Sequence, residues 1–157
     1  MPREHTVIVS GSITNANGDY DLLECVPASG KMLELLNFEI GQTTELGDSA
    51  DEQLDISVVR GNTTSGNGSA VTPRAKEAGS TIASTYEALG STPASAGTAV
   101  TLWNATGKVL LPGPLWTPLP QGAGFFVSGS DLLCIRLNAA VADDVTFRGT
   151  ATLLEYG

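Results

Sequence analysis

The side chains best suited to chemistry in this chain are the carboxylates between positions 45 and 55. Five acidic residues fall in this stretch: Glu45, Asp48, Asp51, Glu52 and Asp55. Calcium binds about six to eight oxygen ligands, which makes Asp48, Asp51 and Asp55 the candidate metal ligands. The spacing matches no EF-hand loop, because Gly47 does not stand where such a loop needs its glycine. The favoured interpretation is a solvated acidic turn without a metal.

Nucleophilic catalysis has few candidate residues. His5 is the single histidine, and its place at the N-terminus predicts an exposed or partner-contacting side chain. No G-x-S-x-G motif accompanies it. A phosphate-binding loop is also missing, because Gly107-Lys108 is followed by Val109. We therefore expect no catalytic residues, no cofactor and no enzymatic activity.

The two cysteines lie in apolar, strand-like runs. Cys25 and Cys134 are predicted to be buried as small hydrophobic side chains. The N-terminal residues lack the apolar stretch of a secretory signal, so we expect synthesis in a host cytoplasm, where both thiols stay reduced.

Aromatic side chains suggest either core packing or contact between subunits. Trp103, Trp116, Phe125 and Phe126 all lie in the C-terminal half, and core packing is the favoured role. Trp116 lies in a proline-rich run that suits a sheet edge. Because aromatic residues are enriched at interfaces, Trp103 and Trp116 are interface candidates.

Composition limits the classes of function. The chain has 157 residues, enough for one domain, and 41% of them are hydrophobic, enough to form a core. The net charge of −9 argues against binding to nucleic acid or to an anionic membrane. Residues 1–60 hold eleven acidic side chains against three basic ones. We interpret this surplus as a solvated face.

The dominant hydrophobic period is two, which is typical of antiparallel strands with one face in the core. Val7 and Val9 alternate with Ile8 and Ser10, for example. The same pattern predicts one core that contains Leu36, Phe38, Ile56, Val58, Ile135, Leu137 and Phe147. No window shows a convincing helical period.

Turn signals separate eight to ten predicted strands. The expected strands lie near 4–13, 19–26, 31–41, 53–60, 99–104, 107–111, 115–118, 124–127, 131–138 and 145–153. This number suits an all-β protein in which two antiparallel sheets form a sandwich, with a jelly-roll-like topology. We treat residues 1–157 as a single domain.

The segment 61–100 differs in composition from the rest. Of its 40 residues, 29 are Gly, Ser, Thr, Ala or Pro, and such a sequence buries too little apolar area to order itself. It is predicted to be a low-complexity arm or extended loop, with Ser80–Leu89 as a short helix or irregular strand. Its apolar anchors are Val71, Ile82, Tyr86 and Leu89. Tyr86 and Leu89 join the interface candidates, on the chain's own surface or a neighbour's.

Several of these features together resemble the small virion proteins of tailed bacteriophages that decorate or cement capsids. The matching stretches include Glu34-Leu-Leu-Asn-Phe-Glu-Ile-Gly41, Leu54-Asp-Ile-Ser-Val-Val-Arg-Gly61, the Gly/Ser/Thr-rich loop, and Ala142-Asp-Asp-Val-Thr. The resemblance implies a β-rich, non-enzymatic, often trimeric protein on the outer surface of the particle. The implied partners are the major capsid protein, other virion proteins and further copies of the chain.

Two other classes of protein remain open. A phage tail or head–tail accessory protein that binds carbohydrate during adsorption would use the same sandwich. A hydrolase on a jelly roll is disfavoured by the single histidine.

Overall fold

The computed structural model describes the chain except for residues 15–17, 44–52, 109–112, 115–119 and 142–143. No described residue is helical. The strands are β1 (Arg3–Ile13), β2 (Tyr20–Val26), β3 (Met32–Gln42), β4 (Gln53–Asn62), β5 (Ser69–Val71), β6 (Arg74–Ala75), β7 (Thr85–Gly90), β8 (Val100–Lys108), β9 (Gly113–Pro114), β10 (Phe125–Ser128), β11 (Leu132–Leu137) and β12 (Val145–Tyr156).

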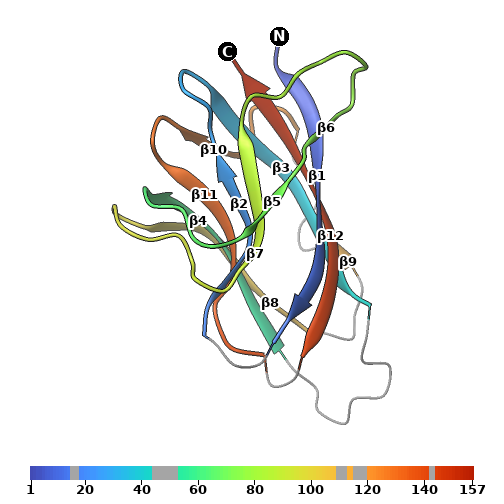
Figure 1. Cartoon of the computed structure of the whole chain (residues 1–157), viewed down its shortest axis with the longest axis vertical. Helices are drawn as coiled ribbons and strands as arrows, with labels where there is room; N and C mark the ends of the chain where they lie inside the picture. Colours follow the sequence, from blue (N-terminus) through green and yellow to red (C-terminus); the bar gives the residue numbers. More distant parts are fainter. Residues whose placement is uncertain (15–17, 44–52, 109–112, 115–119, 142–143) are drawn as a thin grey trace.

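Two antiparallel sheets pack face to face (Figure 1), so the predicted all-β sandwich is confirmed. The first sheet has the strand order β10-β3-β12-β1-β6, and β9 pairs with β3 outside this path. The second has the order β5-β7-β2-β11-β4-β8. The two termini lie side by side, because Arg3 pairs with Glu155 across β1 and β12.

The period-two pattern places the core correctly, with one exception. Six of the seven predicted core residues lie in the main hydrophobic cluster. Leu36 is buried but lies outside that cluster. The cause is a register shift: Asn37 pairs with Thr152 and Leu35 with Leu153, so Leu36 is an extra residue in β3.

A second irregularity changes which residues of β2 face outward. Asp21 and Leu23 pair with successive partners on β11, and Leu22 is skipped. Leu22 and Leu23 therefore both belong to the core. This bulge puts Asp21 and Glu24 on the same outer face of the second sheet, although a spacing of three would separate them on a regular strand.

The C-terminal half differs from the prediction in its strand boundaries. One continuous strand, β8, covers the strand predicted near 99–104 and continues to Lys108, past the start of the separate strand predicted near 107–111. The rest of that second predicted strand lies outside the described residues. It pairs with β4 from Gln53 to Arg60. The strand predicted near 115–118 lies outside the described residues.

Residues 61–100, predicted as a low-complexity arm or extended loop, contribute β5, β6 and β7 to the two sheets. β7 pairs with β2 over most of its length, and β5 pairs with β7. Tyr86 and Ala88 lie in the main core. Composition is misleading here, because Tyr86 and Leu89 lie in a strand that is paired in the sheet, and Val71 and Ile82 also pack against the core.

Residues 62–68 and 91–98 of this segment fold over the outer face of the second sheet as two close, extended stretches. Thr64 and Ser95 form a β-bridge, and the Asn67 N–H donates to the Thr92 carbonyl. A Cβ on Gly66 would lie 2.2 Å from the Thr92 carbonyl oxygen. Glycine is therefore required for this approach of backbone to backbone.

We predict that Gly66→Ala lowers the free energy of unfolding by about 1–3 kcal/mol, because the added methyl group forces the two stretches apart. Gly41→Ala is the matched control, since nothing lies within 4 Å of its added Cβ. Chemical denaturation of both variants measures the difference. Equal stability of the two variants would contradict the close packing of residues 61–68 on 92–98.

Candidate functional site

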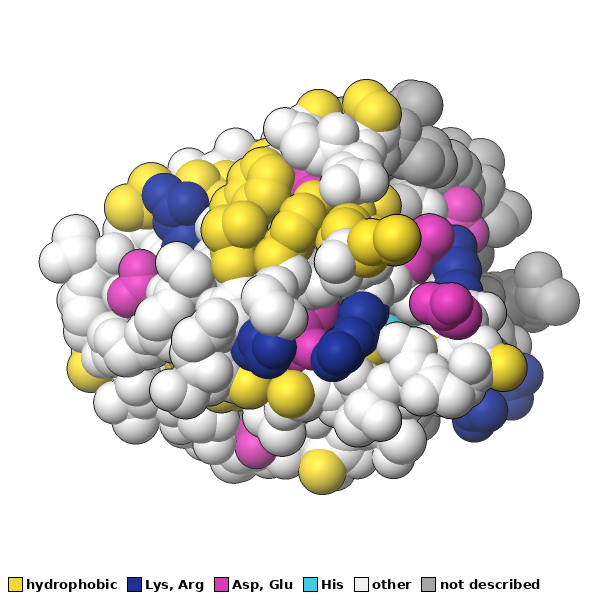
Figure 2. Space-filling view, turned by 90° about the horizontal axis from the view of Figure 1, so that it is seen from above, with side chains coloured by type: hydrophobic (Ala, Val, Ile, Leu, Met, Phe, Trp, Pro, Cys, Tyr) yellow, Lys and Arg dark blue, Asp and Glu magenta, His cyan; other side chains and the backbone are white. Residues whose placement is uncertain are grey.

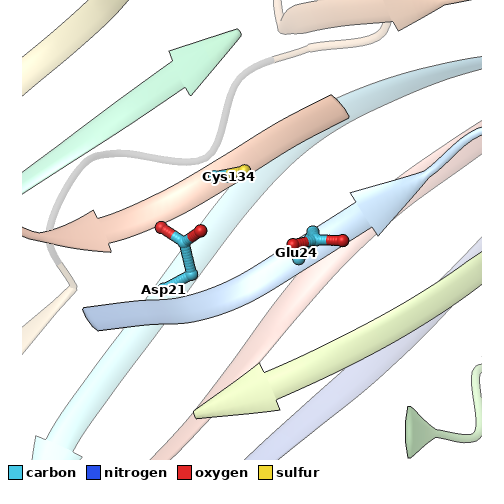
Figure 3. Close-up of side chains that lie close together, drawn as sticks. All are labelled: Asp21, Glu24 and Cys134. Carbon is cyan, nitrogen blue, oxygen red and sulfur yellow. The ribbon is translucent and has the colours of Figure 1, made fainter. Parts of the chain in front are cut away.

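The densest cluster of potential ligands among the described residues lies on the outer face of the second sheet. It contains Asp21 and Glu24 of β2 and Cys134 of β11 (Figure 3), with one ligand atom of each within 4.8 Å of the others. All three residues are buried. Two carboxylates and a thiol are possible ligands of a metal ion. Their hydrogen bonds decide between a metal site and a structural role.

Asp21 is fully engaged by an arginine and by the backbone. Arg136 donates from Nε to Asp21 Oδ1 at 2.6 Å and from Nη2 to Oδ2 at 3.1 Å. The backbone N–H of Ala94 donates to Oδ2 at 2.6 Å, and Arg136 also donates to the Ala94 carbonyl. Asp21 therefore fastens residue 94 to the sheet and neutralises Arg136.

Glu24 and Cys134 complete an anchoring site. The Ser65 hydroxyl donates to Glu24 Oε1 at 2.5 Å, and the Gly66 N–H donates to Oε2 at 3.0 Å. Burial, followed by the charges of Asp21 and Glu24, raises the pKa of the Cys134 thiol, which keeps it protonated. Cys134 packs against Ala94 and Leu132. A metal ion would have to displace these donors, so the cluster serves to hold the covering segment, which consists of residues 62–68 and 91–98.

A second buried carboxylate site lies where the termini meet. Glu155 accepts hydrogen bonds from the Ala83 and Ser84 N–H groups and from the Ser84 hydroxyl, the last at 2.6 Å. Arg3 Nη1 lies 3.8 Å from Glu155 Oε1 and donates a hydrogen bond to the Thr81 carbonyl. Burial acts to raise the pKa of Glu155, but the three hydrogen bonds outweigh it and lower the pKa. Glu155 thereby fixes residues 81–84.

His5 belongs to this region and is completely buried, so the expectation of an exposed or partner-contacting histidine is wrong. Its Nδ1 lies 3.2 Å from the Arg3 carbonyl and therefore carries the proton. Its Nε2 lies 2.5 Å from the Tyr86 hydroxyl and accepts from it. The pair connects β1 of the first sheet to β7 of the second. Burial lowers the pKa of His5 despite the nearby carboxylates of Glu155 and Glu4.

A third loop is held by Glu34 of β3. The N–H groups of Gly122 and Gly124 donate to Glu34 Oε1 at 2.7 and 2.8 Å. The Tyr156 hydroxyl donates to Oε2. Three of the acidic side chains in residues 1–60 (Asp21, Glu24 and Glu34) are thus buried. The interpretation of that acidic surplus as a solvated face is wrong for them.

The predicted site residues are dispersed. Asp55 is half-buried, and its Oδ1 has no hydrogen-bond partner among the described residues. Asp48, Asp51 and Trp116 lie outside those residues. Tyr86 is buried in the main core of its own chain. Leu89 and Trp103 are partly buried against the core, and their role at an interface stays a prediction.

The anchoring carboxylates were missed by sequence reasoning. Asp21 and Glu24 share a face only because of the bulge in β2, and their partners are backbone groups far away in the chain. The one available signal is an acidic residue inside a strongly apolar run, as in Leu22-Leu-Glu-Cys25.

Together, the fold and these contacts describe an all-β sandwich whose loops are fastened by buried carboxylates. Comparison of the chain with protein-family models, curated sequences and solved structures finds no match. Among the described residues, no helix has the length and hydropathy that crossing a bilayer requires.

We predict that Asp21→Asn lowers the free energy of unfolding by about 3 kcal/mol, because it leaves the Arg136 guanidinium without its charge partner. Glu4→Gln is the control: it removes the exposed ion pair with Lys76, and such pairs contribute little to stability. Urea denaturation at neutral pH compares the two. Similar losses in both variants would contradict the anchoring role of Asp21.

A pH dependence follows from His5. The pKa of His5 is lowered in the folded protein. Near the ordinary histidine pKa of about 6.5, His5 therefore binds a proton more readily in the unfolded chain than in the folded one. The contribution of His5 to the free energy of unfolding is therefore complete above that pH, and it decreases as the pH falls toward the lower pKa of His5 in the folded protein. The stabilising contribution of Glu155, whose pKa is lowered by folding, is lost only in more acidic solution, below about pH 4.3.

We predict that His5→Gln, which carries no titrating group, removes most of the loss of unfolding free energy between pH 7 and pH 5. Denaturant titrations at both pH values in the native chain and the variant measure this difference. An unchanged pH dependence in the variant would show that other groups cause it.

Proposed function

We propose that the protein is a non-enzymatic structural protein of a bacteriophage particle, which binds the outer surface of the capsid and stabilises it. The observation that carries this proposal is the use of the buried acidic side chains. Asp21, Glu24, Glu34 and Glu155 all accept hydrogen bonds from loop backbone. They hold the loops of a rigid sandwich, which suits a protein that must resist unfolding.

The surface also supports a role in assembly. Apolar side chains gather at the end of the sandwich that carries the termini, with basic and acidic side chains around them (Figure 2). Exposed apolar patches of this kind mark interaction sites. The net charge of −9 favours solubility before assembly. Trimer formation and attachment to the major capsid protein are parts of the proposal, and the virion surface is the proposed location.

The strand connections support a jelly-roll topology as part of this proposal. From β1 to β4, successive strands alternate between the first and the second sheet, and β10, β11 and β12 alternate again. Two Greek keys in a double-sheet jelly roll produce such alternation. Jelly rolls are common in viral coat proteins.

A tail or head–tail accessory protein with a carbohydrate-binding role is the alternative. Such a protein would present aromatic side chains to a sugar ring at its surface. Phe126 of β10 and Tyr156 of β12, half-buried side chains whose ring centroids lie 6.4 Å apart, are the described pair that favours it.

We predict that phage particles whose genome carries this chain contain hundreds of copies of it, in a fixed ratio to the major capsid protein. Quantitative mass spectrometry of gradient-purified particles measures the ratio, and antibody labelling in electron microscopy gives the location. A few copies confined to the tail, together with binding to host polysaccharide, would favour the alternative. Absence from the particle would contradict both proposals.

A further inference from the structure

Strand β1 forms an open edge of the first sheet for most of its length. Its pairing with β12 continues from Arg3 to Ile13 without a shift. On the other side, β6 pairs only with His5 and Thr6. Among the described residues, no strand pairs with this side of residues 7–13. The edge is therefore a free template for a further strand.

The backbone groups that face this edge can be identified from β6. The Lys76 N–H donates to the Glu4 carbonyl at 2.9 Å, so Glu4 points its backbone groups toward β6. In a regular antiparallel strand, alternate residues point their N–H and C=O groups to the same side. The backbone groups of Ile8, Ser10 and Ser12 therefore face the open edge, and those of Val7, Val9 and Gly11 face β12.

A groove of about 520 Å³ lies along the same edge. Ile8, Ser10 and Ser12 of β1 line one wall, and Ala70 and Val71 of β5 line the other. Leu89, which packs on Gly11, also lines it. None of the lining residues is charged. Ile8 is 45% exposed, which is unusual for a large apolar side chain in this protein.

Natural edge strands are protected against pairing by lysine, proline, bulges or a covering segment. Residues 7–13 contain neither lysine nor proline and have no register shift against β12. A groove beside them leaves room for a strand. This combination favours an interaction in which backbone hydrogen bonds give affinity and small apolar side chains fit the groove.

We propose that this groove binds an extended peptide segment of a partner protein, which adds to β1 as an antiparallel strand in line with β6. The partner segment has small or apolar side chains inside the groove, whose lining residues are uncharged. The proposal is independent of the particle to which the protein belongs.

Two features favour a single strand over a second copy of this chain. β5 lies close to β1 across the groove, and a second sheet joined edge to edge would collide with it. β6 also provides a precedent, because a short segment of chain already pairs with the same edge at His5 and Thr6. A partner strand would continue this pairing toward Ile13.

The test uses the full chain, labelled with ¹⁵N, and the synthetic peptide acetyl-Lys-Thr-Val-Thr-Val-Thr-Lys-amide. At a peptide concentration ten times the dissociation constant, we expect amide exchange at Ile8, Ser10 and Ser12 to slow by about tenfold. Exchange at Val7, Val9 and Gly11 should change little, because these amides already pair with β12. The alternation in exchange rates distinguishes strand addition from non-specific binding in the groove.

Two controls make the test decisive. Ser10→Pro removes one edge N–H and should abolish binding, whereas Ser10→Ala keeps this N–H and should bind normally. If the proline variant does not fold, a peptide N-methylated at alternate residues tests the native chain and should not bind. The proposal is overturned by equal effects at even and odd positions, by binding of the N-methylated peptide, or by no change at millimolar peptide. Dimerisation of the free chain through β1 would overturn it in favour of a second copy.

Discussion

The structure depends on one kind of interaction: a buried carboxylate that accepts hydrogen bonds from the backbone of a distant loop. Burial of an ionised group is costly unless donors replace the lost water, and hydrogen bonds to an ionised acceptor are the strong ones. Glu155 shows the balance, because the donors of Ala83 and Ser84 lower its pKa against the effect of burial. The same contacts satisfy loop N–H groups that would otherwise be buried without partners.

This interaction explains how a segment poor in apolar residues becomes ordered. Residues 61–100 have little hydrophobic area with which to offset their loss of conformational entropy. In addition to the pairing of β5, β6 and β7 in the sheets, the segment is held by Glu24 at Ser65 and Gly66, by Asp21 at Ala94, and by Glu155 at Ala83 and Ser84. The glycines of the segment also help to order it, because they allow residues 61–68 and 92–98 to approach each other closely. The low-complexity composition thus reflects close backbone packing.

The same arrangement bears on function. Because the carboxylates of the Asp21–Glu24–Cys134 cluster already accept hydrogen bonds, the cluster is best explained as an anchor for the covering segment. The more distinctive surface features are the apolar patch at the end with the termini and the uncharged groove beside β1. Both are suited to contact with other protein chains, which agrees with the proposed role in an assembly.

The sequence by itself determined the all-β class, most strand positions and most of the core, because alternation of apolar residues directly reflects burial of one strand face. Val7, Val9, Ile135 and Phe147 illustrate this success. It did not reveal the extra residue at Leu36, the bulge at Leu22 or the burial of His5. Those features arise from pairing between distant strands, which no local pattern encodes. Only the tertiary structure decided that Asp21 and Glu24 share one face, since a shift of one residue in register reverses the direction of every following side chain.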